Sequence, residues 1–208
     1  MHGNKLKLNS KHFKITSEDG ILLFFLISYL IGYIVGVLLI KSQKSAIYSF
    51  SENLFNSSLD IVMSKGFVTV FIYLFVFFLI LSFLIYLSGM NVFGCGIIPA
   101  VMLIYGSFCG IIVSYIYLKF SVSGMGYSAL TVIPVLVIST FIILLSSREA
   151  FCFSEFLLKS VFPDSPMHSL SKSFKLYSFR FLVILLFFIL SSLLGALIIT
   201  TFTQYFDF

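Results

Sequence analysis

The sequence contains no tryptophan, only four prolines and few charged residues, which make up 10% of its 208 positions. Soluble domains carry roughly 25% charged residues, so this chain has too few to cover a water-exposed surface. Hydrophobic residues make up 60% of the chain, and its mean hydropathy is +1.12. The composition therefore predicts a membrane protein with several spans, and it leaves too few residues for a separate soluble domain.

Charged and histidine side chains are absent from five apolar segments, each of them long enough to cross a bilayer as a helix. We therefore predict an all-α fold, a polytopic bundle of five transmembrane helices that form one membrane domain, residues 21–203. A cytoplasmic leader, residues 1–20, precedes this domain, and an extracytoplasmic tail, residues 204–208, follows it. The predicted spans are residues 21–40, 66–88, 92–118, 127–147 and 181–203.

The lack of ionisable residues at membrane depth argues against ion-coupled transport and intramembrane proteolysis, because both keep such residues there for function. The histidines and cysteines show no metal-binding or redox spacing, and no Ser, His and Asp set can assemble without crossing the bilayer. The histidines and cysteines are His2, His12, His168, Cys95, Cys109 and Cys152. We predict no metal, no cofactor and no enzymatic activity.

The basic residues gather near the ends of the apolar segments, as in the cytoplasmic flanks of membrane helices, so they do not indicate nucleic-acid binding. Nine Lys and Arg residues lie in the leader and in the 148–180 loop, against four on the other side of the predicted topology. This asymmetry predicts a multi-pass protein of the cytoplasmic (plasma) membrane, with its N-terminus inside and its C-terminus outside. The lipid bilayer is therefore its first partner.

Two pairs of glycines lie four residues apart inside predicted spans. Gly32 and Gly36 are in the first span, and Gly106 and Gly110 are in the third. Small residues at this spacing let two membrane helices bring their backbones close together. We predict that both pairs are helix-packing positions, and such pairs also allow a protein to self-associate.

Further glycines and prolines surround the connection between the third and fourth spans. The third span is longer than one crossing needs, so we expect it to tilt or to break near its start. A proline removes a backbone hydrogen bond and bends a helix, and we expect a packing kink in the fourth span. These kink and packing positions are Gly94, Gly96, Pro99, Gly124, Gly126 and Pro134.

Two connections have apolar residues at helical spacing. In residues 41–65, Ile47, Phe50 and Leu54 recur at intervals that predict an amphipathic helix on the membrane surface. The alternative is a tether whose apolar residues simply rest on the bilayer. Residues 148–161 carry apolar side chains on one face and charged ones on another, which favours a second interfacial helix.

The segments GCGIIPAVMLIYGSFCG, residues 94–110, and SGMGYSALTVIPV, residues 123–135, together with the five spans and the glycine pair in the first, resemble the stage II sporulation protein M family. The resemblance extends from Ile21 to Thr203 and is strongest between Gly89 and Glu149. It implies a non-enzymatic membrane protein that anchors peptidoglycan-degrading partners during engulfment of the forespore. Other members of the family act outside sporulation.

A scaffold for extracytoplasmic hydrolases needs surface outside the membrane, and residues 41–65 are the longest segment predicted there. We therefore expect Ile47, Phe50 and Leu54 to bind the partner. The competing class is the membrane subunit of a transporter for an uncharged or lipid-like substrate, with spans three and four lining its path. The 148–180 loop could then dock an ATPase.

Overall fold

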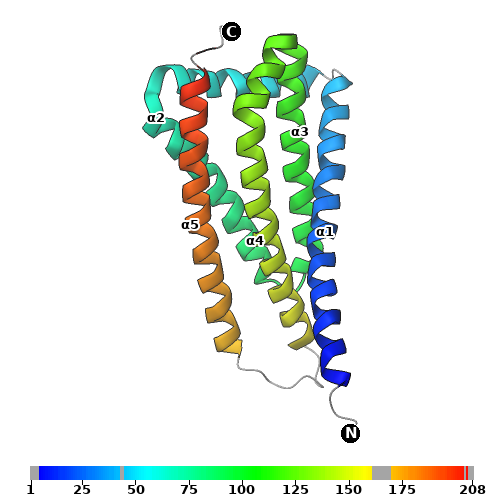
Figure 1. The fold of residues 1–208 in the computed structure, drawn as a ribbon. Helices are drawn as coiled ribbons and strands as arrows, with labels where there is room; N and C mark the ends of the chain where they lie inside the picture. The colour runs from blue at the N-terminus through cyan, green and yellow to red at the C-terminus, as the bar shows by residue number, and fades with distance from the viewer. Residues whose placement is uncertain (1–4, 43–44, 161–169, 204, 206–208) are drawn as a thin grey trace.

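The computed structural model describes residues 5–42, 45–160, 170–203 and 205. Almost all of these residues are helical and none forms a strand, which confirms the predicted all-α fold. Figure 1 shows an up-and-down bundle in which α1 begins at one end and α5 finishes at the other. Its helices are α1 (Lys5–Lys41), α2 (Ser45–Gly89), α3 (Gly94–Tyr127), α4 (Ile133–Ser160) and α5 (Leu170–Thr203), with a π-helix η1 (Ser128–Val132) between α3 and α4.

Four stretches of the described chain are long and apolar enough to cross a membrane: Gly20–Lys41, Gly66–Gly89, Gly94–Ser160 and Ser171–Thr203. The third has 67 residues, far more than the roughly 20 that one crossing needs. It reverses direction at Ser121, where φ is 48° and ψ is −120°. Figure 1 shows its two halves, α3 and α4, side by side. With this stretch divided in two, the described residues form five helices of membrane-spanning length.

The surface of the bundle has the inverse of the polarity expected in water, and the interior also buries small hydroxyl side chains. Large apolar side chains such as Leu23, Ile104 and Leu182 are more than half exposed. Buried positions in α4 include Ser139 and Ser146, whose hydroxyls bond to backbone carbonyls one turn earlier. An apolar surface of this kind is stable in lipid. In the interior, small hydroxyl residues let membrane helices pack closely. The polytopic membrane class predicted from composition is thus confirmed.

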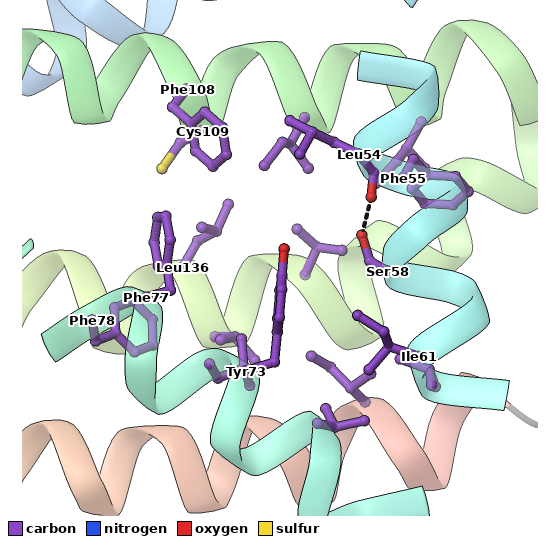
Figure 2. A pocket seen from close by; sticks show the side chains of 18 of the residues that line it. Leu54, Phe55, Ser58, Ile61, Tyr73, Phe77, Phe78, Phe108, Cys109 and Leu136 are labelled. Atoms are coloured by element: carbon purple, nitrogen blue, oxygen red, sulfur yellow. Dashed lines mark hydrogen bonds between the residues drawn. The ribbon is translucent and has the colours of Figure 1, made fainter. Parts of the chain in front are cut away.

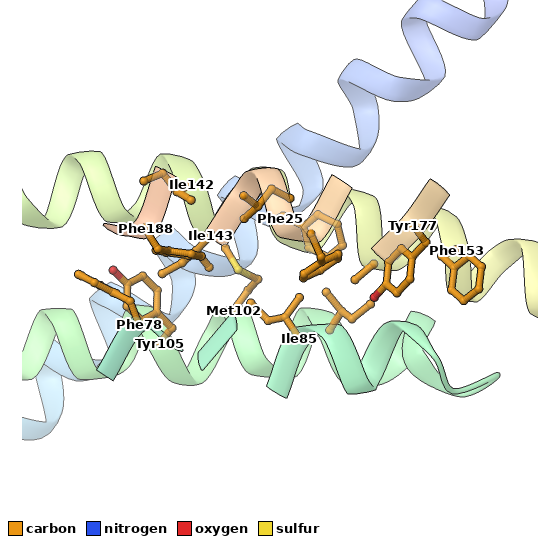
Figure 3. Close-up of a cluster of buried hydrophobic side chains, with 14 of the residues drawn as sticks. Phe25, Phe78, Ile85, Met102, Tyr105, Ile142, Ile143, Phe153, Tyr177 and Phe188 are labelled. Carbon is orange, nitrogen blue, oxygen red and sulfur yellow. The ribbon is translucent and has the colours of Figure 1, made fainter. Parts of the chain in front are cut away.

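The five helices form two pairs with α4 between them. α1 packs mainly against α3, and α2 packs mainly against α5, while α1 and α2 hardly touch. α4 contacts all four of its neighbours and supplies the middle of the largest buried cluster. Figure 3 shows this cluster, in which Phe78 and Phe188 stack with ring centroids 5.6 Å apart, and Met102 and Ile143 lie at its centre.

Gly66 divides α2 into two helices that run in different directions. Its φ of 71° and ψ of 176° lie outside the helical region, in a conformation that glycine adopts without steric cost. Residues 45–65, hereafter the cross helix, lie across one end of the bundle, and residues 66–89 run through it (Figure 1). The helix predicted within residues 41–65 is therefore present. We call the half of the bundle beneath it the pocket end and the opposite half the packed end.

The chain remains helical from the end of α3 through η1 and past Pro134, near the start of α4. Pro134 has no N–H to bond the carbonyl four residues earlier, and its ring crowds that carbonyl. The chain widens into η1 just before it, so that the Ile133 N–H bonds instead to the Ser128 carbonyl, five residues back. Pro99 lies inside α3, whose backbone stays helical there, so the break considered near Gly94 and Gly96 is not found.

The packed end differs from the prediction, because residues 148–160 are not a separate interfacial helix. They continue α4 without interruption to Ser160, and α5 begins at Leu170 and not at residue 181; residue 161 lies outside the described residues. The apolar face of this segment packs on α5, where Phe153 stacks on Tyr177 with ring centroids 4.3 Å apart. Glu149 and Arg180 form an ion pair at 2.6 Å beside them.

The α2–α3 turn is held between these extensions of α4 and α5. Ser154 donates a hydrogen bond to the Asn91 carbonyl at 2.8 Å, and its oxygen accepts one from the Cys95 N–H at 3.1 Å, near the start of α3. Tyr177 donates to the Tyr86 carbonyl at 2.9 Å, in the last turn of α2. A side chain at Gly94 would overlap Ser154 and the Ser88 carbonyl, so this turn fits closely.

Candidate functional site

The two glycine pairs predicted as packing positions lie against each other. A Cβ added at Gly32 or Gly36 of α1 would overlap the carbonyl oxygens of Leu103 and Ser107 in α3. Conversely, a Cβ at Gly106 or Gly110 of α3 would overlap the carbonyls of Tyr29 and Tyr33 in α1. We call this contact the α1–α3 seam. Since all four glycines are buried in it, the surface of this arrangement offers neither pair to a second copy.

The other predicted packing glycines have unequal surroundings. Gly124, in the turn that follows Ser121, faces the Ile116 carbonyl so closely that a side chain would overlap it. Gly126 follows it near the end of α3 and is half-buried. Gly96 is exposed, and no other part of the described chain lies within 4 Å of the position of a Cβ there. Gly96 therefore has no packing role within the bundle.

On the opposite side of α3, the pocket end contains an apolar pocket of about 200 Å³. α3 and α4 form two of its walls, and residues 66–89 of α2 form the third. The cross helix covers it (Figure 2). Most of its lining consists of Leu, Ile, Val and Phe side chains. Representative residues are Leu54 and Ile61 of the cross helix, Phe77 of α2, Phe108 and Ile112 of α3, and Leu136 of α4.

Few polar atoms face this pocket. The hydroxyl of Ser58 bonds to the Leu54 carbonyl within the cross helix, and the hydroxyl of Tyr105 pairs with Ser139 at 3.1 Å. Figure 2 shows the Tyr73 side chain reaching toward the middle of the pocket and Cys109 pointing inward from α3. The Tyr73 hydroxyl has no hydrogen-bond partner among the residues that the structure describes.

The cross helix is fixed over the pocket by a cluster of aromatic contacts and an ion pair. Phe55 is buried against Tyr115, Phe120 and Tyr127, with ring centroids 5.4 to 6.4 Å away. Glu52 accepts a hydrogen bond from Lys119 at 2.9 Å, near the end of α3. The burial of Phe55 contributes most of this attachment, because a partly exposed ion pair is worth under about 1 kcal/mol.

The three residues expected to bind a partner do not form one exposed surface. Phe50 is 55% exposed and does not line the pocket. Leu54 lines the pocket, and Ile47 is half-buried. The described side chains on the outward face of the cross helix are Ser49, Phe50, Asn53, Asn56 and Ser57, and Phe50 is the apolar one among them.

Sequence reasoning did not find the pocket residues Tyr73, Tyr105 and Cys109, because each lies in an apolar span where nothing distinguishes a cavity from a packed core. A tyrosine hydroxyl in the middle of a Phe-rich span is the one signal that could have indicated Tyr73. Among the residues that the structure describes, no three His, Cys, Asp or Glu side chains gather as metal ligands would. The arrangement is suited to holding apolar matter.

Comparison with known proteins adds nothing to this geometry: no family model, no curated protein and no solved structure matches the chain. The resemblance to the stage II sporulation protein M family thus rests on the glycine and proline pattern alone. What that family does bears on this chain only as a proposal.

Proposed function

We propose that this chain is a non-enzymatic scaffold of the plasma membrane, which uses the outward face of its cross helix to hold a partner that remodels the cell envelope. The observation that carries the proposal is Phe50, a large apolar side chain that is 55% exposed next to the polar side chains Ser49, Asn53 and Ser57 among the described residues of the cross helix. Single aromatic anchors surrounded by polar side chains are typical of binding hot spots.

The attachment of the cross helix also supports a scaffold. Phe55 and the Glu52–Lys119 ion pair hold the helix against the bundle, and the α1–α3 seam makes a close contact between two helix backbones. A binding surface that is ordered before its partner arrives loses less conformational entropy on binding. In the orientation predicted from the Lys and Arg residues, this surface lies on the extracytoplasmic side of the membrane. The family resemblance makes peptidoglycan hydrolases the expected partners.

A test replaces Phe50 alone, because Leu54 lines the pocket and its replacement would disturb the roof. Tagged protein is purified from sporulating and vegetative cells, and co-purifying proteins are identified by mass spectrometry. Phe50→Asp should lose the hydrolase, Phe50→Tyr should keep it, and Asn56→Asp, which places the same charge on the same face, should keep most of it. Equal recovery with Phe50→Asp, or no hydrolase with the unaltered chain, would contradict the proposal.

The second candidate is a transporter subunit for an uncharged or lipid-like substrate, and the apolar pocket is the observation that favours it. The pocket occupies only the pocket end, however, and buried side chains such as Met102, Ile143 and Phe153 fill the interior toward the packed end. This arrangement accommodates a bound molecule without a continuous path. Recovery of an ATPase in the same purification from growing cells would favour the transporter.

A further inference from the structure

We propose that the pocket binds one acyl chain of a membrane lipid, drawn from the leaflet at the pocket end, and that the Tyr73 hydroxyl donates a hydrogen bond to the ester carbonyl of that lipid. The proposal does not depend on the scaffold function. Phe50 is 55% exposed and is not among the residues that line the pocket.

The walls of the pocket restrict where an occupant can enter. The cross helix covers the pocket with Leu54, Phe55 and Ile61, which separates it from the aqueous phase at that end. At its inner limit Tyr105 and Cys109 are 4% and 1% exposed and belong to the buried core. An occupant therefore has to enter from the side, between membrane helices.

The side of the pocket is continuous with the lipid-facing surface of α2. Ile61, Tyr73 and Phe77 line the pocket and also line a second, shallower groove on the flank of α2. Ile72 and Ile80, which complete that groove, are more than half exposed. In a membrane this flank is in contact with acyl chains, so a chain can pass from the bilayer into the pocket without crossing a polar boundary.

The size and the lining of the pocket fit part of an acyl chain. Apolar cavities of about 150 Å³ stay dry and accept benzene, so a pocket of about 200 Å³ has space for several methylene groups but not for a headgroup. Left empty, its walls would lose the dispersion contacts that hold membrane helices together. A flexible chain from the adjacent leaflet restores those contacts.

The Tyr73 hydroxyl gives this chain a polar partner. Tyr73 is 47% exposed and lies where the pocket meets the outer groove, and its hydroxyl has no hydrogen-bond partner in the described part of the protein, which is costly in an apolar medium. Tyr73 follows Gly66 by two turns, so it lies on the order of 10 Å along the helix from the level of the cross helix. A carbonyl at the upper end of an acyl chain is the acceptor expected near that depth.

The test uses the purified full chain in phosphatidylcholine vesicles that contain a phosphatidylcholine with a photoreactive diazirine on one acyl chain. After irradiation, adducts are mapped by peptide mass spectrometry. Tyr105 and Cys109 are too buried for ordinary boundary lipid, whereas the neighbouring Ile104 is 68% exposed and serves as an internal reference. We expect adducts on all three residues, and adducts on Ile104 alone would overturn the proposal.

Two matched substitutions separate pocket occupancy from general lipid contact. Leu136 lines the pocket, while the next residue, Val137, is 63% exposed on the outside of α4. Leu136→Trp should fill the pocket and remove adducts on Tyr105 and Cys109 while sparing Ile104, and Val137→Trp should leave all of them in place. Both variants should elute as folded protein in gel filtration. Unchanged pocket adducts in a folded Leu136→Trp variant would contradict the proposal.

The role of Tyr73 is tested with a pair of lipids. An ether-linked probe lipid has the same chain without the ester carbonyl, so it should give a lower yield of Tyr105 adducts than the ester-linked probe. In Tyr73→Phe, which keeps the ring and removes the hydroxyl, this difference should disappear. A difference that persists in Tyr73→Phe would exclude Tyr73 as the donor.

Discussion

The two sides of α3 meet their neighbours in opposite ways. Toward α1, Gly106 and Gly110 bring two helix backbones into direct contact, and no space remains between them. Toward α2, within the same two turns, Phe108 and Ile112 face an apolar pocket of about 200 Å³. Different faces of the same helix therefore form a close backbone contact and the wall of a pocket.

The difference shows what determines helix packing in a lipid environment. Water does not drive these helices together, because lipid tails are as apolar as their side chains. Where the two surfaces are complementary, as in the α1–α3 seam, van der Waals contact suffices. α2 packs mainly against α5 and less against α3, and the surfaces of α2 and α3 leave the apolar pocket between them.

The largest effect is expected from a substitution that pushes α1 and α3 apart at the α1–α3 seam. Gly106→Val places a β-branched side chain against the Tyr29 carbonyl, and the overlap should force α1 from α3 at a cost of about 3 kcal/mol or more. The measurement is the fraction of protein that remains monodisperse after heating in detergent, followed by gel filtration.

Gly96→Val is the matched control, since no described atom outside its own turn of helix lies within 4 Å of a Cβ there. It should leave the heating profile nearly unchanged. If both variants lose stability equally, the cost comes from valine in α3 and not from the seam.

An intermediate effect is expected where α2 and α3 are still held together, at the packed end. Ser154→Ala removes the acceptor of the Cys95 N–H and the donor to the Asn91 carbonyl. Leaving the partly buried Cys95 N–H unpaired should cost about 1 kcal/mol or more in the free energy of unfolding. The α2–α3 turn should also exchange its amide hydrogens faster, as measured by mass spectrometry.

Ser146→Ala provides the comparison for Ser154. Ser146 is equally buried, but its hydroxyl bonds only to the Ile142 carbonyl of its own helix. Its replacement should cost about 0.5 kcal/mol, because no backbone group is left unpaired. Similar losses in the two variants would mean that Ser154 does not hold the turn.

The smallest effect is expected at the roof of the pocket. Glu52→Gln removes the ion pair with Lys119, whose side chains are 40% and 27% exposed, so the cost should stay under about 1 kcal/mol and shrink with added salt. Hydrogen exchange in the cross helix should rise slightly. Glu155→Gln, which breaks an exposed pair within α4, should leave that exchange unchanged, and an equal rise in both would contradict a local role for Glu52.

Much of the fold could be predicted from the sequence. The absence of charges from five apolar segments indicates five spans, and the spacing of Gly32 with Gly36 and of Gly106 with Gly110 indicates packing faces. Which helix each pair faces could not be predicted, because a glycine pair has no partner-specific chemistry. The length of α4 was also misjudged, since Phe153 and its neighbours look alike whether they face lipid headgroups or α5.

Less of the candidate site could be predicted from the sequence. Ile47, Phe50 and Leu54 share a helical spacing in the sequence, yet Phe50 is exposed and Leu54 lines the pocket. Residues three or four positions apart lie close together on a helix, so their spacing alone does not tell which of them meets the bundle, and the direction in which they face depends on the angle at Gly66. Only the structure supplies that angle.

By itself, the sequence determined the membrane class, the five helices and the small residues at which helices can approach. Only the tertiary structure decided that α1 meets α3 through four glycines, that α4 extends to Ser160, and that a pocket opens between α2 and α3. The physical reason is that helices in lipid are apolar all around. Hydrophobic pattern therefore cannot distinguish a face that meets lipid from one that meets protein, and the choice falls to side-chain shape.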